Sequence, residues 1–134
     1  MAVPPVVRQM IVCQRVTPDP GRPDRVDLLG VSDTLRSKTD PPFPTRYPAF
    51  CVFLEVTSCR GAVIGQIQVV EADSGAQMAQ TADHQLPLPN DPLETRLFSF
   101  RILDCPFPNP GLYWVQFWCD GSLVHEVDLT VRAS

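Results

Sequence analysis

Residues 94–131 read ETRLFSFRILDCPFPNPGLYWVQFWCDGSLVHEVDLTV, and in this stretch apolar blocks alternate with turn residues. The blocks are rich in Val, Ile, Phe, Tyr and Trp, which is the composition of β-strands. Pro110-Gly111 and Asp120-Gly121 separate the blocks, and both dipeptides are typical of tight turns. The stretch therefore predicts three consecutive antiparallel strands.

The rest of the chain repeats this pattern. The whole chain has 134 residues, of which 15 are prolines, about twice the usual share. The prolines are clustered, so that apolar blocks of about ten residues lie between the clusters, and no block has the spacing and caps of a helix. The sequence predicts strands at Val6–Val16, Arg25–Arg36, Ala49–Cys59, Ala62–Ala72, Gln77–Leu86, Thr95–Asp104, Leu112–Cys119 and Leu123–Val131.

We therefore expect an all-β fold: a single antiparallel β-sandwich of about eight strands, forming one domain over residues 1–134. The polar content of Gln77–Leu86 predicts an edge strand. Alternation with a period of two assigns the core faces of the clearest strands. The expected core residues are Phe50, Val52, Leu54, Val56, Gly65, Ile67, Val69, Phe98, Phe100 and Ile102.

The turn at Asp120-Gly121 decides which face of Leu112–Cys119 carries the two tryptophans. A two-residue loop pairs Cys119 with Ser122 and places both tryptophans in the core. A three-residue loop pairs Trp118 with Ser122 and turns both outward. We favour the second register, because Tyr113 then points inward after a Pro-Gly corner, where a tyrosine hydroxyl often caps a strand crossover.

The last predicted strand has a clearer apolar face. Leu123, Val127, Leu129 and Val131 share this face, and His125 lies among them. We therefore expect His125 to be buried and hydrogen-bonded rather than catalytic.

Charge and hydropathy exclude several classes of function. The net charge is −4, and the 11 Lys and Arg residues are scattered, so we expect no binding to nucleic acid. No segment approaches about 20 apolar residues, so we expect no membrane span. The N-terminal sequence MAVPPVVRQMIVCQRV does not have the pattern of a signal peptide. We therefore expect a cytoplasmic protein.

The cysteines and histidines do not have metal-site spacing. The five cysteines are an odd number, and no pair is spaced as CxxC. We expect buried thiols, no metal and no cofactor. No nucleophile, phosphate-binding loop or acid–base pair stands out, so we expect no enzymatic activity. The cysteines are Cys13, Cys51, Cys59, Cys105 and Cys119.

Three motifs are similar to those of a known family. They are LLGVSDTL with Leu29-Gly30-Val31, the PFPNPGLY corner with Pro110-Gly111, and the closing Asp120-Gly121 hairpin. They resemble an uncharacterised bacterial family of short proteins. The resemblance implies an immunoglobulin-like sandwich without known activity, so no catalytic residue is transferred. Similar sequences tend to have polar residues where this chain has Trp114 and Trp118.

If they face outward, Trp114, Gln116 and Trp118 form an aromatic stripe on one sheet face. Three placements remain open for the tryptophans: a partner interface, cover by a loop of the same chain, and the core. For an outward stripe we expect a protein partner or self-association as a homodimer. The alternative is a carbohydrate- or ligand-binding module that uses a tryptophan platform.

The proline-rich loop Ser37–Pro48 is the second candidate recognition element. It is long for a connection in a sandwich. Its aromatic residues, Phe43 and Tyr47, are candidate anchors for a partner. They also fit a structural role in which they fill the open end of the sandwich.

Overall fold

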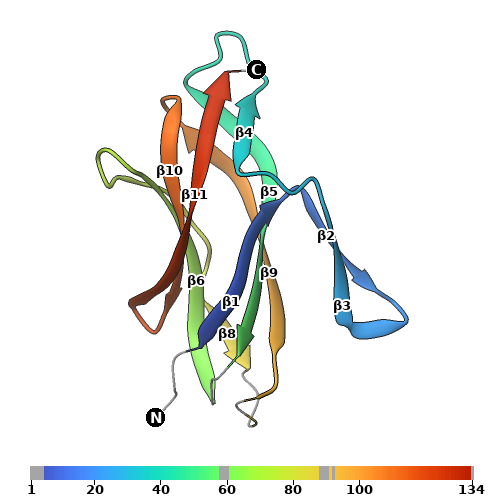
Figure 1. Ribbon diagram of the computed structural model, residues 1–134. Helices are drawn as coiled ribbons and strands as arrows, with labels where there is room; N and C mark the ends of the chain where they lie inside the picture. Colours follow the sequence, from blue (N-terminus) through green and yellow to red (C-terminus); the bar gives the residue numbers. More distant parts are fainter. Residues whose placement is uncertain (1–4, 58–60, 88–90, 92, 134) are drawn as a thin grey trace.

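The computed structural model describes residues 5–57, 61–87, 91 and 93–133. Every regular element within these ranges is a β-strand (Figure 1). No helix in the described ranges is long and apolar enough to cross a membrane. The strands are β1 (Val6–Cys13), β2 (Arg15–Asp19), β3 (Arg22–Leu29), β4 (Thr34–Ser37), β5 (Thr45–Thr57), β6 (Ala62–Glu71), β7 (Gln77–Gln80), β8 (His84–Pro87), β9 (Arg96–Phe107), β10 (Gly111–Cys119) and β11 (Ser122–Ala133).

These strands form three sheets. The smaller main sheet has the order β1-β5-β9, and the larger has the order β4-β11-β10-β6-β7, with β8 also paired to β6. Strands β2 and β3 pair with each other as a separate two-stranded sheet and project from the body as an arm (Figure 1). The all-β prediction is confirmed, and the predicted edge segment does lie at a sheet edge, as β7 and β8.

The larger sheet is mixed, so the prediction of a purely antiparallel arrangement is wrong in one pairing. Strand β4 runs parallel to β11. The cause lies in the segment before β4. Ser32 donates its N–H to Val12 O (3.2 Å), on β1, whereas Asp33 O accepts from Thr130 N (2.8 Å), on β11. The chain thus crosses from one sheet to the other and joins β11 in the same direction.

The two main sheets share one hydrophobic core. From the smaller sheet, β5 contributes Phe50, Val52 and Leu54, which are 0% exposed. Opposite them lie Phe117 and Leu129 of the larger sheet, also fully buried. The predicted faces of β5, β6 and β9 are confirmed, because the alternating side chains assigned to the core are buried or packed against it.

Three of the predicted strands are interrupted, each for a local reason. After Cys13 the chain no longer pairs with β5. The N–H of Gln14 bonds instead to Leu29 O (2.9 Å), at the end of β3 in the arm. Gly30 adopts a φ of 67°, which ends β3. Thr81 bonds to Ile67 through both its backbone N–H (2.9 Å) and its hydroxyl (3.0 Å), and this contact separates β7 from β8.

The β10–β11 hairpin combines features of the two registers expected for it. Its turn pairs Cys119 with Ser122, so the favoured three-residue loop is wrong. A bulge between Phe117 and Trp118 then shifts the register, and Tyr113 pairs with Leu129. This shift turns both tryptophans outward and Tyr113 inward, as the favoured register had predicted.

Two expectations for β11 are wrong. His125 is exposed, and Leu123 is 44% exposed. The bulge removes Leu123 from the core face, because Leu123 now pairs with the outward-facing Trp118. His125 pairs with the buried Phe117 but is itself exposed, so the buried part of β11 begins only further along the strand.

Candidate functional site

The outer surface of the larger sheet carries a group of side chains that we call the tryptophan face. Its centre is Trp114, Gln116 and Trp118 of β10, all half-buried. Cross-strand partners from β6 and β11 flank each of them. The tryptophan face comprises Trp114, Gln116, Trp118, Gln66, Gln68, Val70, Leu123, Glu126 and Asp128.

The alternation of β10 creates this face. Tyr113, Val115, Phe117 and Cys119 are at most 4% exposed and point into the core, which directs the residues between them outward. Strand β6 alternates in the same way, with Ile67 and Val69 buried and Gln66 and Gln68 half-buried on the outer side. The tryptophans therefore lie outside the core.

Hydrogen bonds fix the part of the tryptophan face that lies nearest the turn between β10 and β11. The indole Nε1 of Trp118 donates to Oε1 of Gln116 at 3.0 Å. Nε2 of Gln116 in turn donates to Oε1 of Glu126 at 3.0 Å. A single chain of contacts thus orients Trp118 and Gln116.

A second chain of amides lies beside the first on β6. Nε2 of Gln68 donates to Oε1 of Gln66 at 2.7 Å, and Nε2 of Gln66 donates to Oδ1 of Asp83 at 3.0 Å. Asp83 lies between β7 and β8. The amide groups around the tryptophans are therefore ordered, and their charged acceptors lie toward the margins.

Trp114 differs from Trp118. Its neighbours across the strands are Val70 and Asp128. In the described part of the chain, its indole N–H has no hydrogen-bond partner. The two tryptophans are four residues apart on one strand, hence about 13 Å along it. The face therefore offers two separated aromatic surfaces and one unused donor.

Of the predicted loop Ser37–Pro48, residues 45–48 belong to β5, and both of its aromatic residues pack against the core. Tyr47 is 9% exposed and belongs to the core, where its hydroxyl accepts a hydrogen bond from Gln14 Nε2 (2.9 Å). Phe43 is half-buried against the same core. Ser37 Oγ donates to Pro42 O at 2.6 Å and holds the loop. This packing is compatible with the predicted structural role, and the anchoring of a partner by Phe43 and Tyr47 stays a prediction.

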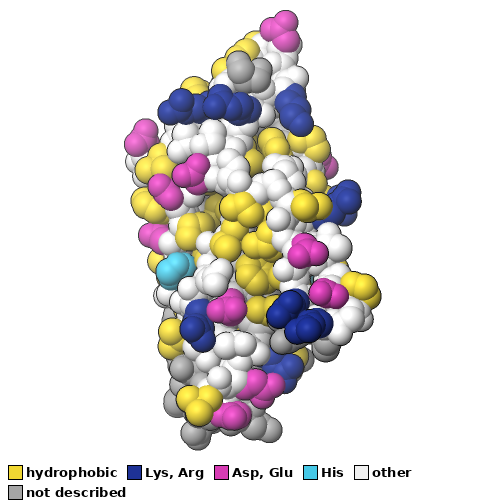
Figure 2. Space-filling view, turned by 45° about the vertical axis from the view of Figure 1, so that its right-hand side comes forward, with side chains coloured by type: hydrophobic (Ala, Val, Ile, Leu, Met, Phe, Trp, Pro, Cys, Tyr) yellow, Lys and Arg dark blue, Asp and Glu magenta, His cyan; other side chains and the backbone are white. Residues whose placement is uncertain are grey.

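A different part of the surface is shown in Figure 2, where hydrophobic side chains gather near the middle and charges of both signs surround them. Between β1 and β11 runs a shallow groove, lined by Met10, Ile11, Val12, Val31 and Val127 among others. No cluster of basic side chains dominates this view, and nothing identifies a ligand for the groove.

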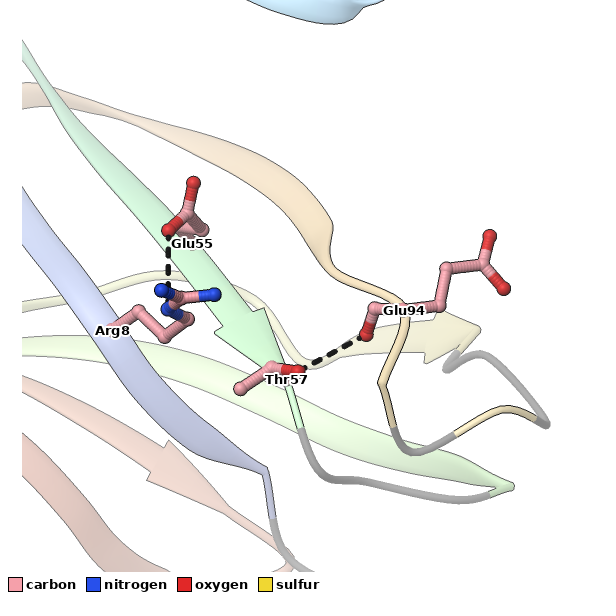
Figure 3. A network of polar contacts seen from close by, with 4 residues as sticks. All are labelled: Arg8, Glu55, Thr57 and Glu94. Atoms are coloured by element: carbon pink, nitrogen blue, oxygen red, sulfur yellow. Dashed lines mark hydrogen bonds and ion pairs between the residues drawn. The ribbon is translucent and has the colours of Figure 1, made fainter.

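Polar contacts near the beginning of β1 connect neighbouring strands (Figure 3). Arg8 Nε lies 3.7 Å from Glu55 Oε1, and Thr57 Oγ1 donates to Glu94 O at 3.2 Å. The Arg8 side chain is 59% exposed, so its ion pair contributes little to stability. These contacts position strands rather than build a reactive site.

The thiols lie mostly inside the protein. Cys13, Cys105 and Cys119 are buried and Cys51 is half-buried, whereas Cys59 lies outside the described residues. Burial raises the pKa of Cys105 to about 12. Over the described ranges, no three His, Cys, Asp or Glu side chains come together as metal ligands.

Some of these residues were not predicted from the sequence. The alternation of Gln66 and Gln68 indicated an outward face but not their position beside the tryptophans. The register of β1 and β5 places Cys13 opposite Cys51. Since these cysteines are far apart in the sequence, no local spacing signalled the pair.

Comparison with known families identifies the chain's relatives. The model of a family of unknown function, DUF6941, matches residues 8–132. The chain belongs to this family. No match was found among curated proteins.

Among solved structures, the chain is similar to a part of β-glucosidase from Listeria innocua. In the complex with isofagomine the TM-score is 0.52 at 12% identity, over 76% of this chain and 15% of that chain. In the complex with glucose the TM-score is 0.52 at 11% identity, over 93% of this chain and 16% of that chain. At these identities the similarity concerns the fold alone, and the DUF6941 chain spans only a small part of that enzyme.

Proposed function

We propose that the protein is a non-enzymatic interaction domain whose tryptophan face binds a protein surface, in the first instance a second copy of the same chain. The observation that carries this proposal is the outward position of Trp114, Gln116 and Trp118 on one strand. Indole rings are large and apolar, and both are only half-buried, so a partner that covers the part still exposed removes further apolar surface from water. Tryptophan is also strongly enriched among residues that dominate binding energy.

The order of the face supports binding. Trp118 and Gln116 are already held by hydrogen bonds that end at Glu126. Side chains that are ordered before binding lose less conformational entropy when a partner covers them. Strand β10 lies between β6 and β11, so its backbone is fixed on both sides.

The tryptophan face carries less charge at its centre than the chain as a whole, which leaves it open to a second copy. The chain carries a net charge of −4, so two copies repel each other over much of their surfaces. The centre of the tryptophan face consists of indole rings and neutral amides, with Glu126 and Asp128 beside it on β11. Two such sheet faces can therefore pack together with indole rings and amides at their centre and the carboxylates of β11 beside them.

Light scattering over a range of concentrations tests self-association. We expect the unmodified protein to form dimers that dissociate on dilution. Trp114→Ala and Trp118→Ala should each weaken the dimer by about tenfold or more. Leu103→Ala is the matched control, because Leu103 is 60% exposed on the other main sheet. A protein that stays monomeric at high concentration, or a dimer that resists both tryptophan substitutions, would contradict the proposal.

A carbohydrate ligand is the second candidate. It is supported by the unpaired indole N–H of Trp114 and by Asp128 beside it, since sugars combine apolar ring faces with hydroxyl groups. Titration of tryptophan emission with oligosaccharides tests this candidate. A saturable change that Trp114→Ala abolishes would favour it over self-association.

We further propose that the architecture is a variant of the immunoglobulin-like sandwich and that the protein is bacterial and cytoplasmic. Tyr113 supports the architectural part: its hydroxyl donates to Asn109 O at 2.6 Å, next to the Pro-Gly corner. Such a contact is typical of the tyrosine corner of these sandwiches. Measuring the location of the protein in fractionated cells tests the cytoplasmic part.

A further inference from the structure

Two cysteines lie opposite each other at the base of the arm. Cys13 ends β1, Cys51 lies in the middle of β5, and the register of the two antiparallel strands pairs them directly. Directly opposite side chains in such a pair project from the same face of the sheet. Their neighbours Val12 and Val52 point into the core, so the two thiols lie on the outer face of the smaller sheet.

The backbone defines the geometry of this pair. Gln14 N–H bonds to Leu29 O and Val12 O accepts from Ser32 N, so the N–H of residue 14 and the carbonyl of residue 12 point away from β5. Those of Cys13 therefore point toward β5, which makes Cys13 and Cys51 a hydrogen-bonded pair with Cα atoms about 5.5 Å apart. This separation lies within the range of about 4.4–6.8 Å that a disulfide spans.

The two thiols differ in access. Cys13 is 1% exposed, whereas Cys51 is half-buried. Burial raises the pKa of Cys13, the neighbouring Cys51 raises it further, and the backbone N–H of Arg15 partly offsets both effects. A reagent therefore meets Cys51 first, and Cys13 lies behind it.

The arm is anchored beside this cysteine pair, at Gln14. Gln14 links the two parts: its backbone carbonyl accepts from Cys51 Sγ (3.7 Å) and its side chain donates to Tyr47 (2.9 Å). Gly30 packs so closely on Gln14 that a Cβ at position 30 would lie 2.6 Å from Gln14 Cγ. Any change at Cys13 and Cys51 is thus transmitted directly to the point where the arm meets the body.

We propose that Cys13 and Cys51 form a reversible disulfide, a modification site that fixes the arm of β2 and β3 to the smaller sheet. The oxidant is a small-molecule disulfide. The Cys51 thiolate attacks one sulfur of this reagent, forms a mixed disulfide and releases one thiol. The Cys13 thiolate then attacks the sulfur of Cys51 and releases the second thiol. Two cysteine thiols are oxidised and one reagent disulfide is reduced to two thiols, whose protons come from the cysteines.

Oxidised glutathione, added to the folded full-length chain, tests the proposal. After acid quenching, mass spectrometry should show chains that have lost two hydrogen atoms, with the Cys13 and Cys51 peptides linked. This link should form at least tenfold faster than a link between any other cysteines. A linked pair that forms only in denaturant, or a different pair that forms faster, would overturn the proposal.

Single variants separate the two steps. Cys13→Ser should retain glutathione on Cys51, because no second thiol displaces it, whereas Cys51→Ser should gain at least tenfold less glutathione at Cys13. Cys13→Ala is the second variant if the serine disturbs the fold, with circular dichroism as the check. If glutathione stays on Cys51 in the unmodified chain as well, Cys13 does not act and the proposal fails.

Hydrogen exchange tests the consequence for the arm. Oxidation should slow exchange of backbone amides in residues 14–30 at least severalfold, and a reductant should restore the original rates. The exchange of β10 serves as the internal control, since that strand lies in the other main sheet. Unchanged rates in residues 14–30 after complete oxidation would contradict the role in fixing the arm.

Discussion

Trp118 is bonded to Gln116 of its own strand: the indole Nε1 donates to the amide Oε1 at 3.0 Å. Residues two apart on a strand project from the same face, so this bond lies across the outer surface of the sheet. Since Gln116 also donates to Glu126 at 3.0 Å, it joins an aromatic ring on β10 to a carboxylate on β11. The orientation of Trp118 thus depends on one amide.

Gln116→Ala should release Trp118. Each of the two lost hydrogen bonds contributes about 0.5–1.5 kcal/mol, and partial exposure places the expected loss in the free energy of unfolding near 1 kcal/mol. The tryptophan emission should shift to longer wavelength, and the dimer should weaken. Urea denaturation and emission spectra measure these effects. Gln77→Ala is the matched control, because Gln77 makes a similar amide bond to Gln80 on the edge strand. Equal effects of both substitutions would argue against a special role of Gln116.

Tyr113→Phe should destabilise the fold without changing the packing of the ring. The hydroxyl donates to Asn109 O at 2.6 Å and accepts from Asn109 N at 3.4 Å. Because Tyr113 is 1% exposed, the lost bonds are not replaced by water, and we expect a loss of about 1–2 kcal/mol in the free energy of unfolding. Urea denaturation with an unchanged slope measures it. A loss below about 0.3 kcal/mol would mean that the corner does not depend on this contact.

Gly65→Ala should overpack the core beside β8. An added Cβ would clash with Cδ1 of Leu86 and would lie 3.0 Å from its Cγ. Since Leu86 is itself buried, we expect a destabilisation of about 1–3 kcal/mol in thermal or urea unfolding. The double variant Gly65→Ala, Leu86→Val should recover part of this loss. Gly21→Ala, with 3.6 Å to its nearest neighbour, is the control and should change stability little.

The stability of the protein should fall at alkaline pH because of Cys105. Burial raises its pKa from 9.0 to about 12, although Arg46 acts in the opposite direction. Between these values the unfolded chain has lost the proton and the folded chain retains it. The stabilisation is therefore complete below about pH 9 and decreases as pH rises, by at most about 1.4 kcal/mol per pH unit.

The difference between the unmodified protein and Cys105→Ala isolates this contribution, because Tyr113 and Cys13 also have raised pKa values. Urea unfolding measured at several pH values from neutral to about pH 11 gives the two curves. The unmodified protein should lose stability more steeply. Parallel curves would show that Cys105 does not retain its proton in the folded state.

The sequence predicted the core better than it predicted the connections. Phe50, Val52 and Leu54 alternate with residues of the outer face, and this period alone identifies a buried strand face. The parallel pairing of β4 with β11 could not be predicted in this way. It depends on Ser32 and Asp33, which bond to strands far away in the sequence.

The candidate site was likewise predicted only in part. The outward position of Trp114 and Trp118 was favoured from Tyr113 and the Pro-Gly corner. The pairings expected from that register were wrong, because a bulge at Phe117 and Trp118 is not signalled by any turn residue. The Cys13–Cys51 pair was missed because it follows from the register of two distant strands. Fold class is thus a property of local alternation, and the sites depend on how strands are aligned.

Acrylamide quenching of tryptophan emission tests the central claim most directly. The chain has only two tryptophans, and both lie on the tryptophan face. All tryptophan emission therefore reports on this surface. If the face binds a second copy, the quenching constant should decrease as protein concentration rises through the dimerisation range. Leu103→Ala, on the other main sheet, should leave this decrease unchanged. A quenching constant that stays the same while light scattering shows dimers would place the contact elsewhere and contradict the account.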